Sequence, residues 1–326
     1  MMKHVATLLT LEPRHQSGLL ALWSRRWGRE FPLDLALWQQ NTDGDPGHFR
    51  AERCWVIEER ETLVGCVALK VPTEPPAWPG QDPKQAWISF LIIEPGRELE
   101  LAPLLMDRAL GWLSGAGFGR VSYGGDPAHF FPGAPEDDVA LGRALETAGF
   151  RPGKAVYDVL GDLRHYRLPD GMDRLLQDAQ ATFGACDASD SQALQRFIDD
   201  HFPGRWAYET RQRLEIEPTP ADILILRRGA EVIGFCHAYH RGSRRIGPSI
   251  SWRQAIGDHY GGLGPLGVAP AFRGRGLGFA LLALAVEHLR GLGAEYVVID
   301  WTTLVDFYRR LGFHVWRTYR SWRLDL

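Results

Sequence analysis

The stretch that decides the fold runs from Val268 to Gly278 and reads V-A-P-A-F-R-G-R-G-L-G, with the apolar run FALLALAVEHL directly after it. This pattern predicts a strand that ends at Pro270 and an amphipathic helix from about Gly276 to Leu292. The first four N–H groups of a helix have no partner inside it. Three residues without side chains leave these groups uncovered: Gly274, Gly276 and Gly278.

This loop carries positive charge at the point where the helix begins. The helix dipole favours an anion there, and Arg273 and Arg275 add fixed charge. The loop is not a Walker loop, because no Gly-Lys-Ser/Thr follows, and it lacks the G-x-G-x-x-G dinucleotide fingerprint. The sequence therefore predicts a pyrophosphate site, with a surface turn that binds nothing as the alternative.

The spacing Arg273-x-x-Gly276-x-Gly278 resembles the Q/R-x-x-G-x-G/A pattern of the GNAT acetyltransferase family. In that family the loop amides hold the pyrophosphate of acetyl-CoA. The resemblance implies acetyl-CoA as co-substrate and no metal. It also implies a binding site made of Leu266, Gly267, Val268, Arg273, Gly274, Arg275, Gly276, Leu277, Gly278 and Phe279.

The strand before the loop contains Gly264-Pro265, and a proline inside a strand predicts a bulge or a break in the ladder. GNAT domains have a bulge in this strand that opens a slot for the pantetheine arm. By resemblance, backbone groups of Leu266 and Val268 would bond that arm, and a backbone N–H would polarise the thioester carbonyl. A bulge that only relieves sheet twist is the alternative.

A second constellation runs from Asp300 to Phe313. Thr303 and Asp306 have the spacing of a capping box that starts a short helix, which Gly312 ends. Tyr308 stands where GNAT enzymes commonly keep a tyrosine near the cofactor sulfur, so the resemblance implies a general acid for the departing thiolate. The alternative is a tyrosine that only packs.

The general base is less defined, because the strand LGPLGV contains no Glu, and Trp301 stands where many relatives have Asn. Asp300, at the end of a strand beside the expected slot, is the first candidate. Three histidines follow it: His259, His237 and His240. Each histidine is more often structural than catalytic.

Two halves of the chain share one plan. The same landmarks recur in both halves at a nearly constant separation: a pair of strands, a strand followed by Glu-Pro or Ala-Pro, a helix, and a Gly-Phe pair. This recurrence indicates a duplicated domain. Two unrelated α/β domains are the alternative. We expect domains at 1–167 and 172–326, separated by the polar segment 167–171. Each is expected to be α+β, with a mostly antiparallel mixed sheet and helices on both faces.

The first half lacks the loop arginine and the tyrosine of the second half. In the matched alignment Glu98 takes the place of Arg273, and Leu145 takes the place of Tyr308. The whole chain thus resembles tandem GNAT proteins, a group that includes mycothiol synthases, with a degenerate first domain. The segment 129–138, HFFPGAPEDD, is expected to be a surface loop or to reach the acceptor cleft.

Composition narrows the function classes. The 326 residues carry a net charge of −3 and no basic stripe, which argues against nucleic acid as a partner. The four cysteines are scattered, which argues against a zinc site and fits a reducing cytoplasm. A signal peptide and a membrane span are not expected, because the apolar runs are short. We expect a soluble cytoplasmic protein.

The expected function is transfer of an acetyl or short acyl group from acetyl-CoA to a primary amine of a small molecule. Two alternatives remain open at this point. One is a non-enzymatic sensor or interaction module that binds acyl-CoA, and the missing strand Glu favours it. The other is acetylation of a protein amino group.

Overall fold

The computed structural model describes residues 6–45, 47–216 and 222–326, and these divide into two compact units. Unit 1 comprises Met1–Pro76, Asp82–Tyr157 and Arg317–Leu326, and unit 2 comprises Ala77–Gln81 and Asp158–Trp316. The expected cut between residues 167 and 172 does not coincide with this division. The reason is that two long strands each contribute residues to both units.

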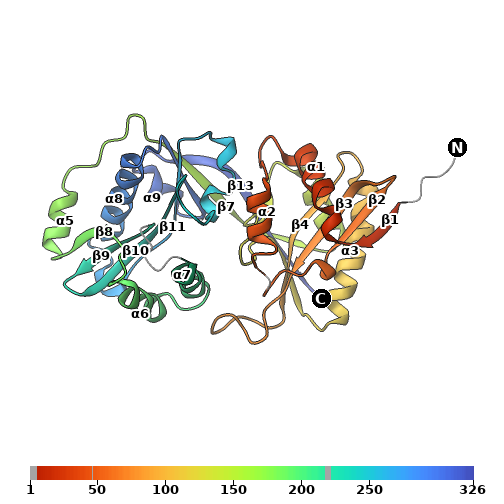
Figure 1. Ribbon diagram of the computed structural model, residues 1–326, viewed down its shortest axis with the longest axis horizontal. Coiled ribbons are helices and arrows are strands. Elements are labelled where there is room, and N and C mark those ends of the chain that lie inside the picture. The colour runs from red at the N-terminus through yellow and green to blue at the C-terminus, as the bar shows by residue number, and fades with distance from the viewer. Residues whose placement is uncertain (1–5, 46, 217–221) are drawn as a thin grey trace. The chain divides into compact units, whose positions relative to one another are not determined.

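Unit 1 contains a mixed sheet with the strand order β1-β2-β3-β4-β5. Only the β4–β5 pair is parallel among these neighbours, and the other pairs are antiparallel. Helices α1 and α3 cover opposite faces of this sheet (Figure 1). The strands are β1 Thr7–Thr10, β2 Trp55–Glu59, β3 Thr62–Lys70, β4 Gln85–Ile93 and β5 Arg120–Tyr123, with a short β6 at Ala134–Pro135; the helices are α1 Gln16–Trp27, α2 Leu35–Asn41, α3 Glu98–Gly115 and α4 Val139–Thr147.

Unit 2 repeats this arrangement with the order β12-β11-β10-β9-β8, in which only β11 and β12 are parallel. Helix α8 packs on one face, where a side chain at Gly261 would meet Leu289 of α8. On the other face a side chain at Gly267 would meet Phe202, which follows α6. The strands are β8 Thr182–Ala185, β9 Ile223–Arg228, β10 Glu231–His240, β11 Tyr260–Val268 and β12 Tyr296–Thr302; the helices are α5 Met172–Asp178, α6 Ser191–His201, α7 Arg205–Ile216, α8 Leu277–Gly291 and α9 Val305–Arg309.

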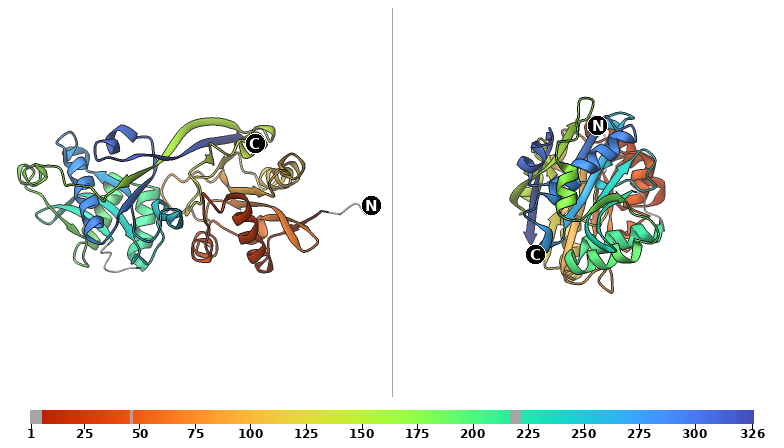
Figure 2. Two further views of the ribbon diagram at one scale, coloured as in Figure 1. Left: turned by 90° about the horizontal axis from the view of Figure 1, so that it is seen from above. Right: turned by 90° about the vertical axis from the view of Figure 1, so that its left-hand side faces the viewer.

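Two long strands complete both sheets. Strand β7, Arg151–Asp162, begins in unit 1 and ends in unit 2, and β13, His314–Asp325, begins in unit 2 and ends in unit 1. In unit 1 the end of β13 pairs antiparallel with β5, from Trp322↔Tyr123 to Asp325↔Arg120. In unit 2 the end of β7 lies next to β12 (Figure 2). Each half of the chain therefore supplies a strand segment to the sheet of the other.

Short 3-10 helices fill several connections and help to define the site. They lie at Pro13–His15, Ala51–Arg53, Pro248–Ile250, Arg253–Ala255 and Pro270–Phe272. The helix at Pro248–Ile250 packs against β10, β11 and β12. Ser249 from this helix lies so close to β11 that a side chain at Gly262 would reach within 2.4 Å of its Oγ. Glycine is therefore required at position 262 for this packing.

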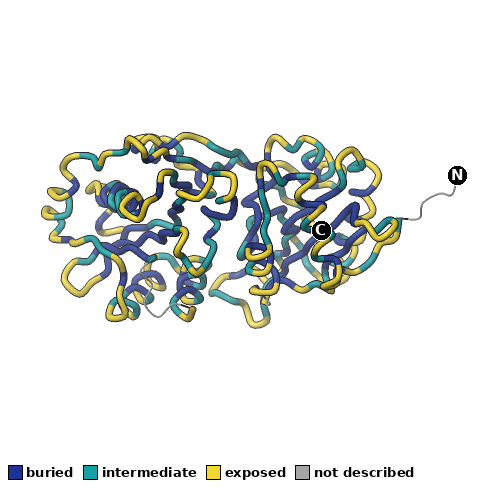
Figure 3. The backbone as a smooth tube through the Cα atoms, turned by 45° about the horizontal axis from the view of Figure 1, so that its top comes forward, coloured by how far each residue is buried: buried dark blue, intermediate teal, exposed yellow. Residues whose placement is uncertain are grey.

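The core of each unit follows its strands, as the buried parts of the tube show (Figure 3). Unit 1 has an aromatic centre in which the rings of Trp23, Phe90, Phe130 and Phe131 lie within 5.6 Å of one another in several pairs. Phe130 is 2% exposed and Phe131 is fully buried. The expectation of a surface or cleft loop at 129–138 was wrong for these residues, because burying two phenylalanines stabilises the fold by roughly 1.5–3 kcal/mol each.

The fold class predicted from the sequence is confirmed in both units: a mostly antiparallel mixed sheet with helices on both faces. Within the described ranges, none of the helices is both long and apolar enough to cross a membrane.

Candidate functional site

The loop between β11 and α8 leaves a row of backbone N–H groups open. Strand β11 ends at Val268, the 3-10 helix Pro270–Phe272 follows, and α8 begins at Leu277. In the described part of the chain, the N–H groups from Gly274 to Gly278 donate to no protein acceptor. They lie at the positive end of a 15-residue helix. This arrangement suits an anion.

Glycine is needed at two positions of this loop. Gly274 has φ 74° and Gly276, the residue before α8, has φ 79°, a left-handed conformation that other residues rarely adopt. A side chain at Gly276 would also meet Leu175 of α5 at 3.1 Å. The space over Gly274 is open. The glycines predicted from the sequence as phosphate-binding thus have the required backbone shape.

Arginine side chains surround the loop. The Nε of Arg273 donates to the carbonyl of Val268 at 3.0 Å, which holds this guanidinium at the end of β11. Arg275 is exposed and lies 5.8 Å from the ring of Phe272. Arg310, after α9, lies 4.0 Å from the ring centre of Phe279 and was not identified from the sequence. Its only sequence signal was its position two residues after Tyr308. Together these groups keep the loop positive.

The slot that the sequence predicted begins where β11 and β12 separate. Their parallel pairing ends at Leu263↔Ile299, although β11 continues to Val268. The register between β10 and β11 shifts between Cys236 and Ala238, opposite Gly264 and Pro265. The predicted bulge is therefore confirmed. Beyond it, the β12-facing edge of β11 from Gly264 to Val268 forms no strand pair in the described residues.

Asp300 lies on β12 just past the point of separation. A side chain added at Gly264 would come within 3.5 Å of its Oδ1, so the carboxyl faces the bulge of β11. Burial, followed by the negative charge of Asp158 on β7, raises the pKa of Asp300 to about 8. A carboxyl with this pKa can accept a proton near neutral pH, and it holds one firmly at pH 5. This property suits a general base.

Tyr308 on α9 is 9% exposed and forms a side-chain hydrogen bond with Thr302. Burial, followed by the neighbouring thiol of Cys236, raises the pKa of the phenol to about 12. The phenol is therefore protonated at neutral pH and available as a hydrogen-bond donor. The charge of Asp300 also contributes to this shift, so the acid and base candidates lie in one neighbourhood.

The start of α9 differs from the prediction. Leu304 precedes the helix, and no side chain caps it. The N–H of Leu304 donates a hydrogen bond to the Oγ1 of Thr302 at 2.9 Å, and not to Thr303. Asp306 is exposed and pairs with Arg309. The predicted capping box of Thr303 and Asp306 is wrong, because the chain turns at Thr302, one residue earlier, to bring its hydroxyl inside.

The three histidine candidates for the base lie in different surroundings. His237 is 2% exposed, and its ring contacts the hydroxyls of Thr210 (3.2 Å) and Tyr239 (3.4 Å). Burial lowers its pKa well below the usual value. His240 pairs with Asp222 at 3.1 Å. His259 is exposed and precedes β11, at the opposite end of that strand from Val268. His237 lies on β10 at the register shift, but its ring is held by Thr210 and Tyr239. Of the four base candidates, Asp300 is the one whose side chain comes within 4 Å of a Cβ at Gly264.

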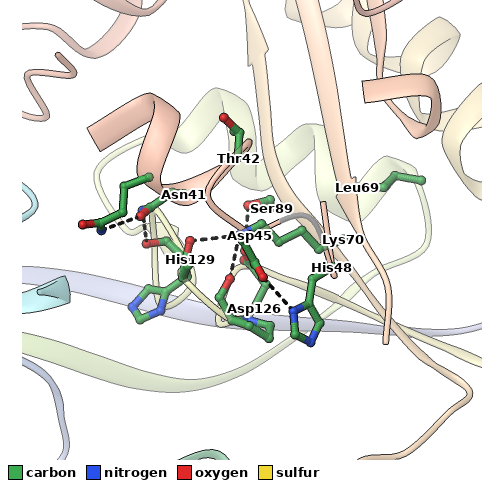
Figure 4. Close-up of polar contacts among 12 residues, drawn as sticks. Asn41, Thr42, Asp45, His48, Leu69, Lys70, Ser89, Asp126 and His129 are labelled. Carbon is green, nitrogen blue, oxygen red and sulfur yellow. Dashed lines mark hydrogen bonds and ion pairs between the residues drawn. The ribbon is translucent and has the colours of Figure 1, made fainter. Parts of the chain in front are cut away.

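The corresponding place in unit 1 is filled. The β4–β5 pairing ends at Ile88↔Tyr123, and the register of β3 and β4 shifts around Ser89. Ser89 Oγ donates to Asp126 Oδ2 at 2.8 Å, which bridges the two separating strands. Lys70 Nζ lies 3.2 Å from both Asp126 and Asp45, and the lysine is fully buried (Figure 4).

The start of α3 occupies the place in unit 1 that the loop before α8 occupies in unit 2, and its residues differ from those of that loop. Its first turn carries Glu98 and Glu100. Glu98 pairs with Arg26, and Arg97 pairs with Glu100 and Glu59. Two carboxylates at this position oppose a bound phosphate. Leu145, matched to Tyr308, is fully buried and has no ionisable group.

One neighbour of Asp300 comes from the end of the first half of the sequence. Asp158 lies in the segment that closes the first half in sequence, but it belongs to unit 2. Its Oδ1 accepts a hydrogen bond of 3.1 Å from the N–H of Trp301. The sequence carried no signal for this contact, because the two residues are 143 positions apart.

Comparison with known proteins agrees with this architecture. The family model of the acetyltransferase (GNAT) family matches residues 191–313, which contain the loop, the bulge and α9. This part of unit 2 is therefore similar to GNAT acetyltransferases. Mycothiol acetyltransferase of Streptomyces avermitilis is 24% identical over 351 residues, with 99% of this chain and 96% of the relative covered.

Other relatives of this chain align over shorter lengths. Mycothiol acetyltransferase of Corynebacterium glutamicum strain R is 28% identical over 159 residues, or 46% of this chain and 49% of the relative. The alignment thus spans about half the length of that relative. Among solved structures, the GCN5-related glucosamine N-acetyltransferase region of a fungal multi-domain GH3 β-N-acetylglucosaminidase matches with a TM-score of 0.87 and 24% identity. It covers 99% of this chain and 38% of that one. This likeness shows that the GNAT fold extends over both units.

Proposed function

We propose that this chain is an acetyl-CoA-dependent N-acetyltransferase that acts on a primary amine of a small molecule. The observation that carries the proposal is the continuity of the site in unit 2. Open backbone N–H groups at the start of α8 lie at one end of β11, and the bulge beside Asp300 lies farther along the same strand.

Acetyl-CoA would supply an activated acetyl group as a thioester. The N–H groups of Gly274 to Gly278 and the guanidinium of Arg275 would hold the pyrophosphate. The proposed contacts of Leu266, Gly267, Val268, Arg273, Leu277 and Phe279 would hold the rest of the arm. The β12-facing edge of β11 supports this, because its groups beyond Leu263 are not used by strand pairing. One of these N–H groups would stabilise charge on the carbonyl oxygen.

Asp300 would accept the proton of the attacking ammonium, directly or through a water molecule, so that a neutral amine attacks the carbonyl carbon. The C–N bond forms as the C–S bond breaks, and the nitrogen gives up its second proton, which replaces the one that Tyr308 passes to sulfur. The products are an amide and CoA with its thiol protonated. Tyr308 would give its proton or a hydrogen bond to the departing sulfur. Its high pKa keeps it protonated, and the burial that raises it would also raise the pKa of a thiol bound beside it.

The acceptor is proposed to be a cationic amine. Glu209 on α7 and Asp158 both act on Asp300 through their negative charge, and Arg205, which pairs with Glu209 at 2.6 Å, acts in the opposite sense. Once ionised, Asp300 would itself attract the ammonium group of the acceptor. Glucosamine is the first acceptor to test, because the fungal region with the same fold carries that name. The exposed ring of Trp301, 40% accessible, offers an apolar surface at the same place.

We also propose the cytoplasm as the location. All four cysteines are buried and free of disulfides, which fits a reducing compartment. The proposed partners of the chain are acetyl-CoA and the small amine.

The test is release of free CoA by the full chain in the presence of acetyl-CoA and a panel of small amines that includes glucosamine. We expect release with at least one amine and none with its N-acetylated form. If acetyl-CoA binds but no amine increases CoA release above hydrolysis, the chain is a sensor. Release with lysine peptides alone would favour protein acetylation.

A further inference from the structure

We propose that Asp158 is a positioning residue for Asp300: its buried carboxylate fixes the backbone of the turn at Trp301 and acts on Asp300 through its charge. This inference rests on the proposed function and assigns a role to a residue from the strand that ends the first half of the sequence. Asp158 is 3% exposed and belongs to β7.

The first support is the backbone of Trp301. Its φ is 46°, a left-handed value that is uncommon for a residue other than glycine, asparagine or aspartate. Such a conformation is strained and persists only where neighbouring groups hold it. The hydrogen bond from the N–H of Trp301 to Asp158 Oδ1 is such a restraint. Because Asp300 precedes Trp301 directly, the bond also fixes the direction in which its carboxyl points.

The second support is the position of Asp300 against β11. Its Oδ1 would lie 3.5 Å from a side chain at Gly264, so the carboxyl stands at the bulge. A turn that relaxed toward ordinary φ at Trp301 would rotate the peptide between the two residues and move the carboxyl away. The left-handed turn is therefore tied to the direction of the base candidate.

The third support is the charge around Asp300. Asp158 from β7 and Glu209 from α7 disfavour its ionisation, and Arg205 from α7 favours it. Tyr308 from α9 and Tyr239 from β10 are the other titratable groups that sense its charge. After burial, Asp158 is the strongest of the influences on Asp300. Like charges held close together raise the pKa of one partner, and such a pair titrates as a unit.

The exchange of strands is what brings this carboxylate to the site. Residues 151–157 of β7 belong to unit 1, and Asp158 is the first residue of β7 in unit 2. The sheet of unit 2 needs this strand beside β12. The first half of the chain therefore contributes a residue to the second site, although its own slot is closed.

The experiment uses three variants of the full chain. Asp158→Asn keeps an oxygen acceptor for Trp301 and removes the charge. Asp158→Ala removes both. Asp162→Asn is the control, because Asp162 lies on the same strand and pairs only with Arg164 among the described residues. The carboxyl resonance of Asp300, assigned with Asp300→Asn, is followed by ¹³C NMR from pH 4 to pH 10 without substrates.

We expect the Asp300 titration midpoint to fall by roughly one pH unit or more in Asp158→Asn, and to stay unchanged in Asp162→Asn. In an activity assay, the rise of kcat/KM with pH should move down by the same amount. Asp158→Ala should also lose turnover at every pH, because nothing holds the N–H of Trp301. Asp158→Asn keeps an acceptor for that N–H, so at high pH, where Asp300 is ionised in both proteins, its turnover should be close to that of the parent.

An Asp300 midpoint that is equal in Asp158→Asn and the parent protein would overturn the inference. So would equal turnover of Asp158→Ala and the parent. Because the NMR titration needs no acceptor, it separates this inference from the proposed function. A shifted midpoint in a protein that never releases CoA would contradict the proposed function alone.

Discussion

Ser89 and Asp126 form a hydrogen bond of 2.8 Å across the point where β4 and β5 of unit 1 separate. The matching point of unit 2 is occupied by Gly264 and Asp300, which leave the strands unbridged. The two units therefore differ at this point: buried polar groups join the separating strands in unit 1, and no such bond joins them among the described residues of unit 2.

The first prediction is a stoichiometry of one acetyl-CoA per chain. Unit 1 places Glu98 and Glu100 at the start of α3, where unit 2 has glycines and free N–H groups. Titration calorimetry with acetyl-CoA should give a value near one. A value near two would mean that the altered helix start of unit 1 still binds the pyrophosphate.

The second prediction concerns the ionic cluster that fills the slot of unit 1. Replacing the fully buried Lys70 by Met leaves the carboxylates of Asp45 and Asp126 without their shared cation. Breaking a buried ion pair in this way costs about 3–5 kcal/mol, so the free energy of unfolding should fall by that order. Chemical denaturation followed by tryptophan fluorescence measures it.

The control for this cluster is Lys84→Met, at an exposed lysine of the same unit, which should change stability by less than about 0.5 kcal/mol. Acetyl-CoA binding by folded Lys70→Met should match the parent, because the proposed loop lies in unit 2. An equal stability of Lys70→Met and the parent would show that the cluster does not hold unit 1 together.

The third prediction is loss of acetyl-CoA binding in Gly276→Asp. The change puts a negative side chain among the open N–H groups, at φ 79° and within reach of Leu175. Calorimetry should detect no binding, and circular dichroism should report a folded chain. The matched control is Gly291→Asp at the opposite end of α8, where the added side chain meets open space. If Gly276→Asp binds acetyl-CoA as the parent does, the loop is misassigned.

The fourth prediction is a loss of turnover in Tyr308→Phe. The variant keeps the ring packed against Phe307 and Phe313 and removes the hydroxyl. General acid catalysis contributes about 10²–10⁴-fold, and kcat should fall by that order if thiolate departure limits the rate. Acetyl-CoA affinity should stay within a factor of about three, because the pyrophosphate contacts lie elsewhere.

Tyr296→Phe serves as the control for this measurement, since Tyr296 lies at the start of β12, beside Arg164. Equal losses of affinity and turnover in Tyr308→Phe would mean that the hydroxyl binds the cofactor. Full activity would leave Tyr308 with a packing role.

The fifth prediction is a rise of activity with pH around the pKa of Asp300, about 8. The base works only when it is ionised, so kcat/KM should increase as the pH passes from 6 to 9. In Asp300→Asn the part of the rise in kcat/KM that comes from ionisation of Asp300 should disappear. Any rise that is left comes from titration of the amine acceptor. A profile that is identical in both proteins would exclude Asp300 as the base.

The same group gives a prediction for stability with a definite sign. Because the pKa of Asp300 is higher in the folded chain than its usual 3.8, the folded state holds this proton more tightly. Its contribution favours folding below pH 4 and is lost as the pH rises toward 8. Asp300→Asn should therefore raise the melting temperature more at pH 8.5 than at pH 5. Differential scanning calorimetry checks this, and an equal effect at both values would contradict the raised pKa.

Much of the fold followed from local patterns. The strand expected to end at Pro270 and the helix expected from about Gly276 to Leu292 correspond to β11, which ends at Val268, and to α8, Leu277–Gly291. These elements were readable because alternating or periodic apolar residues are needed wherever a strand or helix packs on a core. Glycine at 274 and 276 was readable for a similar reason, since left-handed backbone there excludes other residues.

The prediction of the α9 start failed for a reason that is also physical. Thr302 and Thr303 are neighbours with the same capping chemistry, and local sequence does not distinguish them. In the structure Thr302 is buried and its hydroxyl accepts from the N–H of Leu304, whereas Thr303 is exposed. The loop at 129–138 failed in the same way, since its phenylalanines become core only through contact with Trp23 and Trp38.

The sequence by itself determined that the chain has two halves of one plan, and that the second half carries a glycine-rich loop before a long helix. It also placed Asp300 and Tyr308 together on the segment that follows that helix. These are properties of short segments, where backbone preference and periodicity act over a few residues. Only the tertiary structure decided that β7 and β13 each serve both units, that Ser89, Asp126 and Lys70 close the first slot, and that Asp158 stands beside Asp300. Strand pairing and ion pairing join residues of any separation, so the local sequence carries no record of them.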